Sequence, residues 1–544
     1  MERQPVSQHD LWALDPSYEP FAGERDLTHR DADWSGLSVL VIGLGVSGFA
    51  AADALLERGA RVRVVSRDHS DVMAERAQIL DVLGADVAFG AEHMDAAPEG
   101  THLIVTSPGV APSAPIMQDA MSRGIPVWGE VELAWRMRPR EGGAPWLTIT
   151  GTNGKTTAVT MLESMLKAQG LRAVAAGNVG MPLLEAVLHP QPYDVIAVEL
   201  SSFQLHWSRT VSPYASCCLN VAPDHVDWHG SYEEYKRQKG RVYERTQVAC
   251  VYNVDDPATE AMVEDAEVVD GCRAIGFTLG TPGPSMVGIV DDVLADRAFI
   301  AERRTSAAEL AILSDLGPNA SAPHYVADAL AAAALARSYG VTLAAVRQGL
   351  VDYTPQPHRM ASVAEVGGVR WVDDSKATNP PAAQASLQAF DPVVWIAGGL
   401  LKGAEVDWMK DLAWTRYPQT TEGTESKPPL GGIEMGVAQS SSNQEQAWEA
   451  VECLTSQESQ KAYMLGTGNP ADKMWTRPSL SVLAIDATPV AEAINILPSV
   501  CRAKVGLRVA PGGDATQDLE ALMEHLRTHV PYGAQVEVTP GEAG

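Results

Sequence analysis

The stretch "WLTITGTNGKTTAVTML", residues 146–162, decides the fold class of this chain. An apolar run ending at Ile149 enters a turn at Gly151 and Gly154, and Thr156 and Thr157 then begin a helical segment. A strand that runs through a Gly-rich turn into a helix presents unpaired backbone N–H groups and a positive helix end to an anion. The stretch therefore predicts a nucleotide-phosphate loop in an α/β domain, which is favoured over an accidental Gly-rich loop.

Length and composition limit the possible classes. A chain of 544 residues predicts about three or four domains, and its 45% hydrophobic content suffices for globular cores. A formal charge of −28 argues against general affinity for nucleic acid or anionic membrane, although a local basic pocket for phosphate stays open. The expected partners are small molecules and the expected location is the cytoplasm, because residues 1–16 lack a leader pattern.

The cysteines form no metal-ligand spacing, so partly buried free thiols are favoured over a disulfide framework. The six are Cys217, Cys218, Cys250, Cys272, Cys453 and Cys501.

An earlier βαβ pattern starts with "LSVLVIGLGVSGFAAADALLERGARVRVVSR". Gly43, Gly45 and Gly48 have dinucleotide-type spacing, but the second strand ends at Ser66 and Arg67 without the acidic residue that would hold a ribose. A nucleotide-bearing ligand other than NAD is favoured, and NAD and a purely structural unit stay open. The next strand stops in a turn at residues 107–109 that could bring backbone amides to a ligand.

Further βα units follow in a second region and, after a linker in "VDYTPQPHRM", in a third. Alternating units predict parallel sheets with ligands at the carboxyl ends of the strands. Glu199 follows one such strand, and Asp224, His225 and Asp227 follow another, where carboxylates near a phosphate loop suit Mg²⁺. Taken alone, each has a plainer interpretation as a capping, surface or structural residue, and Lys239 reads as part of a solvated helix face.

The ordered motifs "GTNGKTT", "GNVG", "ELSSFQL", "LNVAPDHVDWHGSYEEYKRQKGRVYE", "PHRM", "DDSKATNP" and "GGLLKG" resemble the UDP-N-acetylmuramoyl-L-alanine:D-glutamate ligases (MurD) of the Mur ligase family, over about residues 37–407. The resemblance implies an ATP-dependent, amide-forming ligase of peptidoglycan synthesis, acting as a monomer. ATP would phosphorylate the carboxylate of UDP-MurNAc-L-alanine, and the amine of D-glutamate would then displace phosphate, because a carboxylate oxygen is a poor leaving group.

The resemblance also implies roles for individual residues. The expected catalytic residues are Lys155, Glu199, His225, Lys239 and Lys376. Those expected to bind ATP are Gly151, Thr152, Asn153, Gly154, Lys155, Thr156, Thr157, Arg359 and Asp374. Those expected at the substrates are Gly45, Val46, Ser47, Ser107, Asn178, Ser201, Gln204, Thr378 and Lys402. Two Mg²⁺ sites would involve Thr156, Glu199, His225 and Lys239, with Lys239 carbamylated by CO₂. Tyr325 stands where the family usually has an adenine-contacting asparagine, which puts that contact in doubt.

Beyond about residue 410 the resemblance stops. The segment around "AWEAVECLTSQESQKAYM" resembles a sugar-binding protein of ABC transporters, and "PSLSVLAIDATPV" onward resembles the dimerisation domain of zinc dipeptidases. We expect domains at 1–145 (Rossmann-like, UDP-substrate-binding), 146–353 (P-loop ATPase), 354–410 (start of an amino-acid-binding domain), 411–475 and 476–544 (the two fragments). The third parallel sheet would be incomplete, tail strands would pair weakly or not at all, and residues 414–430 would be protease-sensitive. The alternative function is a catalytically impaired chimera that retains nucleotide binding.

Overall fold

The computed structural model describes residues 25–366, 369–390 and 393–397, and four further strands. The chain divides into two units, Met1–Ala389 and Phe390–Gly544, which are described separately. Within the described residues no helix has both the length and the apolar character needed to cross a bilayer.

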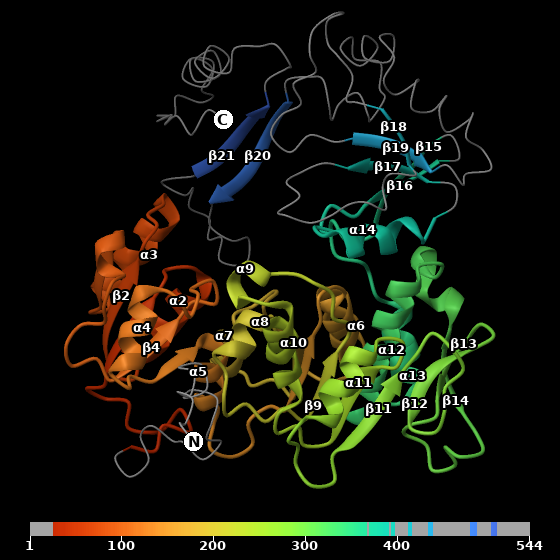
Figure 1. Cartoon of the computed structure of the whole chain (residues 1–544), viewed down its shortest axis with the longest axis horizontal. Helices are drawn as coiled ribbons and strands as arrows, with labels where there is room; N and C mark the ends of the chain where they lie inside the picture. The colour runs from red at the N-terminus through yellow and green to blue at the C-terminus, as the bar shows by residue number, and fades with distance from the viewer. Residues whose placement is uncertain are drawn as a thin grey trace, which may run out of the picture. The chain divides into compact units, whose positions relative to one another are not determined.

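The first unit begins with a five-stranded parallel sheet in the order β3-β2-β1-β4-β5. Its strands are β1 (Ser38–Ile42), β2 (Arg61–Ser66), β3 (Asp86–Phe89), β4 (Leu103–Thr106) and β5 (Val127–Gly129), and its helices are α2 (Val46–Leu56), α3 (Asp71–Val82), α4 (Pro115–Ser122) and α5 (Glu130–Arg136), with a short 3-10 turn at Ala91–His93. Helices lie beside the sheet in Figure 1. Val39 and Val41 pack in one cluster with α2, whereas Leu40 and Ile42 pack in another with α4. The alternation explains why both faces of these strands are apolar.

A nine-stranded sheet follows, in the order β14-β13-β12-β11-β10-β9-β6-β8-β7. Its strands are β6 (Trp146–Thr150), β7 (Ala173–Gly177), β8 (Val195–Glu199), β9 (Ala215–Cys218), β10 (Ala249–Asn253), β11 (Arg273–Phe277), β12 (Met286–Val290), β13 (Val293–Asp296) and β14 (Ala308–Ile312). The strands from β7 to β12 run parallel, and β13 and β14 continue the sheet antiparallel. Strand β6 therefore lies inside the sheet, between β8 and β9.

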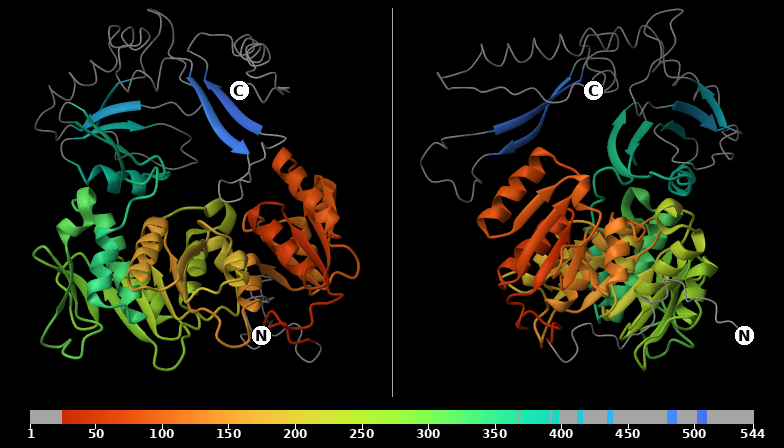
Figure 2. Two further views of the ribbon diagram at one scale, coloured as in Figure 1. Left: turned by 180° about the vertical axis from the view of Figure 1, so that it is seen from behind. Right: turned by 60° about the vertical axis from the view of Figure 1, so that its left-hand side comes forward.

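The helices of this second region are α6 (Lys155–Ala168), α7 (Leu183–Leu188), α8 (Ser202–His206), α9 (Val226–His229), α10 (Tyr232–Gly240), α11 (Pro257–Glu264), α12 (Pro323–Ser338) and α13 (Leu343–Val351), with 3-10 turns at Arg241–Tyr243 and Leu313–Asn319. Helices α12 and α13 both pack on α6 (Figure 2). The Ala-rich sequence of α12 explains this close approach, since nearly all its central residues are buried. The α6 helix that follows the phosphate loop is thereby held firmly.

The expected parallel sheets are confirmed for these two regions, but strand pairs of the third region are antiparallel. Strands β15 (Ala361–Val366) and β16 (Val369–Asp373) form a hairpin, which a connection this short requires, because a parallel pair needs a crossover of a dozen or more residues. Helix α14 (Pro380–Leu387) completes the first unit.

In the second unit, β17 (Val394–Ala397), β18 (Leu412–Thr415) and β19 (Glu434–Ala438) form an antiparallel sheet in the order β17-β19-β18. Strands β20 (Ser479–Asp486) and β21 (Arg502–Arg508) pair antiparallel. The expectation of weak or absent pairing in the tail is therefore wrong for these strands, which find partners along most of their length. Lys402 and most of residues 414–430, including the expected protease-sensitive sites, lie outside the described residues.

Candidate active site

The carboxyl ends of three adjacent parallel strands bring the main candidate residues together. Glu199, the last residue of β8, lies in register with Ile149 of β6 on one side and with Gly177 of β7 on the other. The phosphate loop follows β6 and Asn178 follows β7, so all three segments emerge at one sheet edge. This is where ligands bind in open parallel sheets.

The loop itself adopts the conformation that its glycines allow. Gly154 has φ +83°, and a Cβ there would lie 2.2 Å from Oδ1 of Asp328 on α12. Helix α6 starts at Lys155, whose Nζ donates to the carbonyl oxygens of Gly151 and Thr152 at 2.9 Å each. Burial lowers the pKa of Lys155, the charge of Arg359 lowers it further, and Glu199 opposes the shift. The loop thus holds a lysine that is folded back on its own backbone.

Glu199 is 2% exposed and accepts hydrogen bonds from two expected site residues. Oγ1 of Thr156 donates to Oε2 at 2.8 Å, and Nδ2 of Asn178 donates to Oε1 at 2.8 Å. A hydroxyl and a carboxylate directly beside a phosphate loop are oxygen donors of the kind Mg²⁺ takes when phosphate and water complete its shell. These residues fit that ion, and the described residues contain no group of three or more His, Cys, Asp or Glu that would form a separate metal cage.

Lys239 on α10 is buried. The interpretation of this residue as part of a solvated helix face is therefore wrong. Its side chain is among the largest that are nearly fully buried, and Nζ donates to the carbonyl oxygen of Gly151 at 2.7 Å. Nζ also lies 4.8 Å from the ring centre of Tyr235. Burial, followed by the charge of Lys155, lowers the pKa of Lys239 to about 7. A lysine at this position is therefore substantially neutral at physiological pH.

His225 is less closely integrated. Its side chain is 49% exposed, and Nε2 lies 3.7 Å from the Asp224 carboxylate. Its ring contacts that of Phe203, at 4.8 Å between centres. The structure thus brings Thr156, Glu199, Lys155 and Lys239 around the loop, and leaves His225 at the exposed start of α9 with φ +50°.

A second histidine, His229, is the last residue of α9 and is buried, unlike His225. It is 7% exposed, and its Nε2 lies 2.9 Å from the hydroxyl of Ser202. Burial lowers the pKa of His229 to about 4. Sequence reasoning did not single it out, because an isolated histidine in a turn carries no burial signal.

Asn153, in the loop, is held by two asparagines. The side chain of Asn220 accepts from the Asn153 backbone N–H at 2.9 Å and donates to its carbonyl oxygen at 3.2 Å. The side chain of Asn153 pairs with that of Asn379, which caps α14. Asn220 directly follows the run that forms β9, and a polar residue at a strand end was the available signal for it.

Residues of the third region are held near the linker. Asp374 Oδ1 accepts from the Met360 backbone N–H at 3.0 Å, and its Oδ2 accepts from the Ser386 hydroxyl. Lys376 is exposed, and its backbone N–H donates to the carbonyl of His358 at 3.1 Å. Thr378 is also exposed. The charge of Arg359 acts on both Lys155 and Asp328, so Arg359 lies near the phosphate loop.

Asp328 and Tyr325 lie on the same helix, α12. Burial raises the pKa of Asp328 well above its usual value, although Arg359 and Lys155 oppose the shift. An acid in an otherwise apolar helix was the signal for this residue. Tyr325 is 4% exposed, and the side chain of Asn319 hydrogen-bonds its hydroxyl.

The Gly-rich turn of the first sheet is tightly packed. A Cβ on Gly48 would lie 1.9 Å from the Gly43 carbonyl oxygen, and one on Gly43 would lie 2.5 Å from Oγ of Ser107. That hydroxyl is buried without a hydrogen-bond partner in the described part of the chain. Gly45 is the N-cap of α2, and Val46 beside it is 55% exposed. Ser47 is half-buried at the start of this helix, so the turn has an open side.

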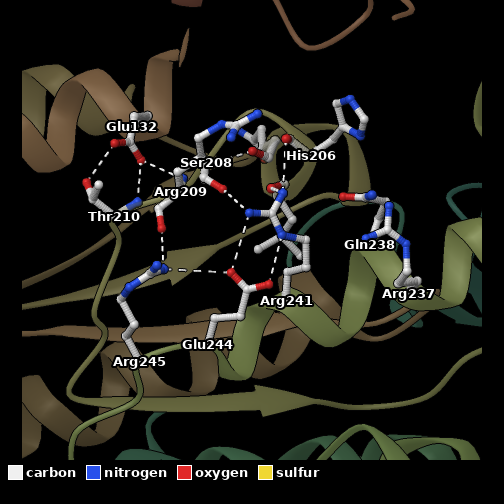
Figure 3. Close-up of polar contacts among 12 residues, drawn as sticks. Glu132, His206, Ser208, Arg209, Thr210, Arg237, Gln238, Arg241, Glu244 and Arg245 are labelled. Carbon is white, nitrogen blue, oxygen red and sulfur yellow. Dashed lines mark hydrogen bonds and ion pairs between the residues drawn. The ribbon is translucent and has the colours of Figure 1, made fainter. Parts of the chain in front are cut away.

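A polar joint connects α5 to the loop after α8 (Figure 3). The buried Glu132 carboxylate accepts from the backbone N–H groups of Arg209 and Thr210 at 2.7 and 2.9 Å, and pairs with Arg136. Arg241 donates to the carbonyl oxygens of residues 205, 206 and 208 at the end of α8. The joint fixes the strand-end segment that contains the next pair of expected residues.

Ser201 and Gln204 form the cap of α8. The Ser201 hydroxyl accepts from the Gln204 backbone N–H at 3.2 Å, and Gln204 Oε1 accepts from the Ser201 backbone N–H at 2.9 Å. Both side chains therefore have a structural role in capping α8.

Comparisons with known proteins identify the family. Residues 37–129 match the Mur ligase MurD-like N-terminal domain, and residues 149–306 match the Mur ligase middle domain. The UDP-N-acetylmuramoylalanine--D-glutamate ligase of Streptomyces coelicolor is 56% identical over 69% of this chain and 79% of its own length. That of Leifsonia xyli is 52% identical over 70% and 76%. The solved structure of UDP-N-acetylmuramate-alanine ligase from Thermotoga maritima is 19% identical over 65% of this chain and 78% of that chain, with a TM-score of 0.39. On the strength of the sequence relatives, the chain belongs to the MurD family of Mur ligases.

Proposed function

We propose that this protein is an ATP-dependent ligase that joins D-glutamate to UDP-N-acetylmuramoyl-L-alanine in peptidoglycan precursor synthesis. The relatives named above carry that activity in their names. The observation that carries the proposal in the chain itself is the hydrogen bond from Thr156 to Glu199, which places a hydroxyl and a carboxylate beside the phosphate loop. Next to a phosphate loop, that combination suits phosphoryl transfer with Mg²⁺.

The chemistry has two bond-forming steps. An oxygen of the substrate carboxylate attacks the γ-phosphorus of ATP, and ADP leaves. The D-glutamate amine then attacks the resulting acyl phosphate, loses a proton, and phosphate departs as the C–N bond is completed. Both steps bring anions together, so positive charge and fixed donors must offset repulsion.

The loop residues supply these groups in the proposal. Gly151 to Thr157 hold the phosphates, and Lys155 moves from the carbonyls of Gly151 and Thr152 onto the β- and γ-phosphates. The lowered pKa of Lys155 is restored when phosphate arrives, because a nearby anion favours the charged form. Thr156 and Glu199 hold Mg²⁺, which, when bound, screens the repulsion between ATP and the incoming carboxylate.

A second Mg²⁺ involves His225 and a carbamylated Lys239. Only a neutral amine attacks CO₂, and the buried Lys239, with a pKa near 7, meets that condition at neutral pH. The new N–C bond releases one proton and gives a carbamate anion that retains one N–H, enough to keep the hydrogen bond to Gly151. The exposed ring of His225 would turn from Asp224 toward this group.

The other expected residues complete two substrate sites. The UDP end binds at the first turn, at Gly45, Val46, Ser47 and Ser107, where the unpartnered Ser107 hydroxyl fits a polar ligand. Asn178, Ser201 and Gln204 lie at substrate-facing positions. Arg359 and Asp374 approach ATP, and Lys376, Thr378 and Lys402 approach the transferring phosphate and D-glutamate.

A second candidate function follows from the length of the match. The relatives align with about 70% of this chain. The segments expected from the sequence to resemble a sugar-binding protein and a dipeptidase dimerisation domain lie in the remainder. In this alternative the protein binds nucleotide, forms acyl phosphate weakly and fails to position D-glutamate. Amide formation from purified chain, ATP, Mg²⁺ and both substrates distinguishes the two: product at a rate matching phosphate release supports the ligase, and phosphate release without product supports the impaired chimera.

A further inference from the structure

Two side-chain amides join segments that lie 226 residues apart in the sequence. Nδ2 of Asn379 donates to Oδ1 of Asn153 at 2.9 Å, and Nδ2 of Asn153 donates to Oδ1 of Asn379 at 3.2 Å. Two antiparallel hydrogen bonds between planar groups fix orientation as well as distance. The phosphate loop and the segment 373–379 are therefore held in one relative position.

Each member of this amide pair is itself anchored. Asn220 holds the backbone of Asn153 through both its amide nitrogen and its amide oxygen. Oδ1 of Asn379 also accepts from the Ala382 backbone N–H at 2.9 Å, as the N-cap of α14. Since the backbone of Asn153 and the side chain of Asn379 are each held by a further contact, the pair transmits position between the two segments.

The segment 373–379 is also attached to the linker, where Nδ1 of His358 lies 2.6 Å from the Asp373 carboxylate. At its start, the Asp374 side chain and the Lys376 backbone are bonded to Met360 and His358 of the linker. Its far end meets the phosphate loop through the side chain of Asn379. Loss of the amide pair would leave residues 376–379 tied to the linker and no longer to the loop.

We propose that Asn379 is a positioning residue for phosphoryl transfer, which acts by pairing with Asn153 and thereby holds Lys376 and Thr378 at the phosphate loop. The inference rests on the proposed ligase function and adds to it a contact between the second and third regions. Reaction rate depends on such placement, because small displacements of a reacting or binding group are costly.

A purely structural role for Asn379 as a helix cap makes a different prediction. Asn379→Ser retains a hydroxyl that can cap α14, but it is too short to pair with Asn153. The matched variant Asn153→Ser breaks the same pair from the other side and leaves the cap intact. If capping were the whole role, Asn379→Ser would behave as wild type.

The experiment combines turnover with hydrogen exchange. We expect Asn379→Ser to lower kcat about ten-fold, the effect of losing one or two net hydrogen bonds, with little change in KM for ATP. The double variant should be no slower than the slower single variant, because the two residues act as one unit. In the nucleotide-free protein, Asn153→Ser should speed amide exchange in residues 376–379, although the substitution lies in another segment.

The exchange measurement needs no turnover, so it separates this inference from the proposed function. An inactive wild type would remove the ligase proposal, and the exchange result would still decide whether the pair holds the segment. Unchanged exchange in Asn153→Ser, or wild-type kcat in Asn379→Ser of an active enzyme, would overturn the positioning role.

Discussion

Thr156 donates a hydrogen bond to Glu199 over 2.8 Å, although 43 residues separate them in the sequence. The parallel register of β6 and β8 creates this contact, since it places the start of α6 beside the end of β8. In the proposed function this pair holds Mg²⁺ beside the phosphate loop.

Replacement of Thr156 tests that interpretation. Thr156→Ala should raise the Mg²⁺ concentration for half-maximal phosphate release by about ten-fold, because one oxygen ligand is lost. Thr156→Ser, which keeps the hydroxyl, should stay close to wild type. A Mg²⁺ dependence that is the same in all three proteins would remove Thr156 from the metal site.

Replacement of Lys155 should cause a larger loss of activity than replacement of Thr156. Lys155→Ala should reduce ATP-dependent phosphate release by about two orders of magnitude or more, because the charge on the β- and γ-phosphates disappears. The fold should persist, since its Nζ bonds the loop carbonyls of Gly151 and Thr152 rather than another element. Lys167→Ala is the matched control: Lys167 lies on the same helix and pairs with Glu163 at the surface. Full turnover by Lys155→Ala would contradict the assignment.

Lys239 should confer a dependence on CO₂. Lys239→Ala should lose about 100-fold in rate, and short carboxylic acids such as acetate should restore part of it by occupying the space of the carbamate. Lys236→Ala removes the partly exposed lysine of the same helix, which pairs with Glu233, and should have little effect. Loss without any rescue, together with a wild type indifferent to CO₂ removal, would limit Lys239 to its bond with Gly151.

The same lysine predicts a pH dependence of stability in CO₂-free buffer. Its pKa falls from 10.5 to about 7 on folding, so the unfolded chain binds more protons between these values. The cost of burying the ammonium is fully present below about pH 7 and fades as pH rises toward 10.5. Lys239→Met should therefore raise Tm near pH 7, by an amount that shrinks on going to pH 10. A constant difference in Tm across that range would contradict the lowered pKa.

The lowered pKa of His229 predicts how the stability of the fold changes at acid pH. Its pKa is about 4 in the folded chain against 6.5 in the unfolded chain, so stability should decline as pH falls from 6.5 to 4. The loss of stability is complete below pH 4. In His229→Gln, which can still bond Ser202, this part of the decline should be absent. Thermal unfolding of both proteins between pH 4 and pH 7 measures it, and parallel curves would show that His229 does not titrate there.

The sequence contained the information for the two parallel sheets, because βα alternation and strand-end polar residues follow from short-range pattern. It also pointed to Glu199 and the phosphate loop as neighbours, which the order of strands then explains. The burial of Lys239 could not be predicted from its neighbours in the sequence, because a lysine among arginines and glutamates on α10 looks solvated. Its hydrogen bond to Gly151 spans 88 residues. The same holds for the pairing of Asn153 with Asn379.

The antiparallel hairpin of β15 and β16 shows another limit. Both runs look like strands of βα units, and only the short connection between them decides the direction of pairing. In the second unit, β17 pairs with β19 rather than with β18, the next strand along the chain. Pairing of this kind depends on which edges are available, and not on the pattern of one strand.

The most direct test of the account is coupled measurement of phosphate and amide product from the purified chain with ATP, Mg²⁺ and UDP-MurNAc-L-alanine, with and without D-glutamate. The account predicts that D-glutamate stimulates phosphate release and that one amide bond forms for each phosphate. No phosphate release under these conditions, or release that D-glutamate neither stimulates nor converts into product, would contradict it.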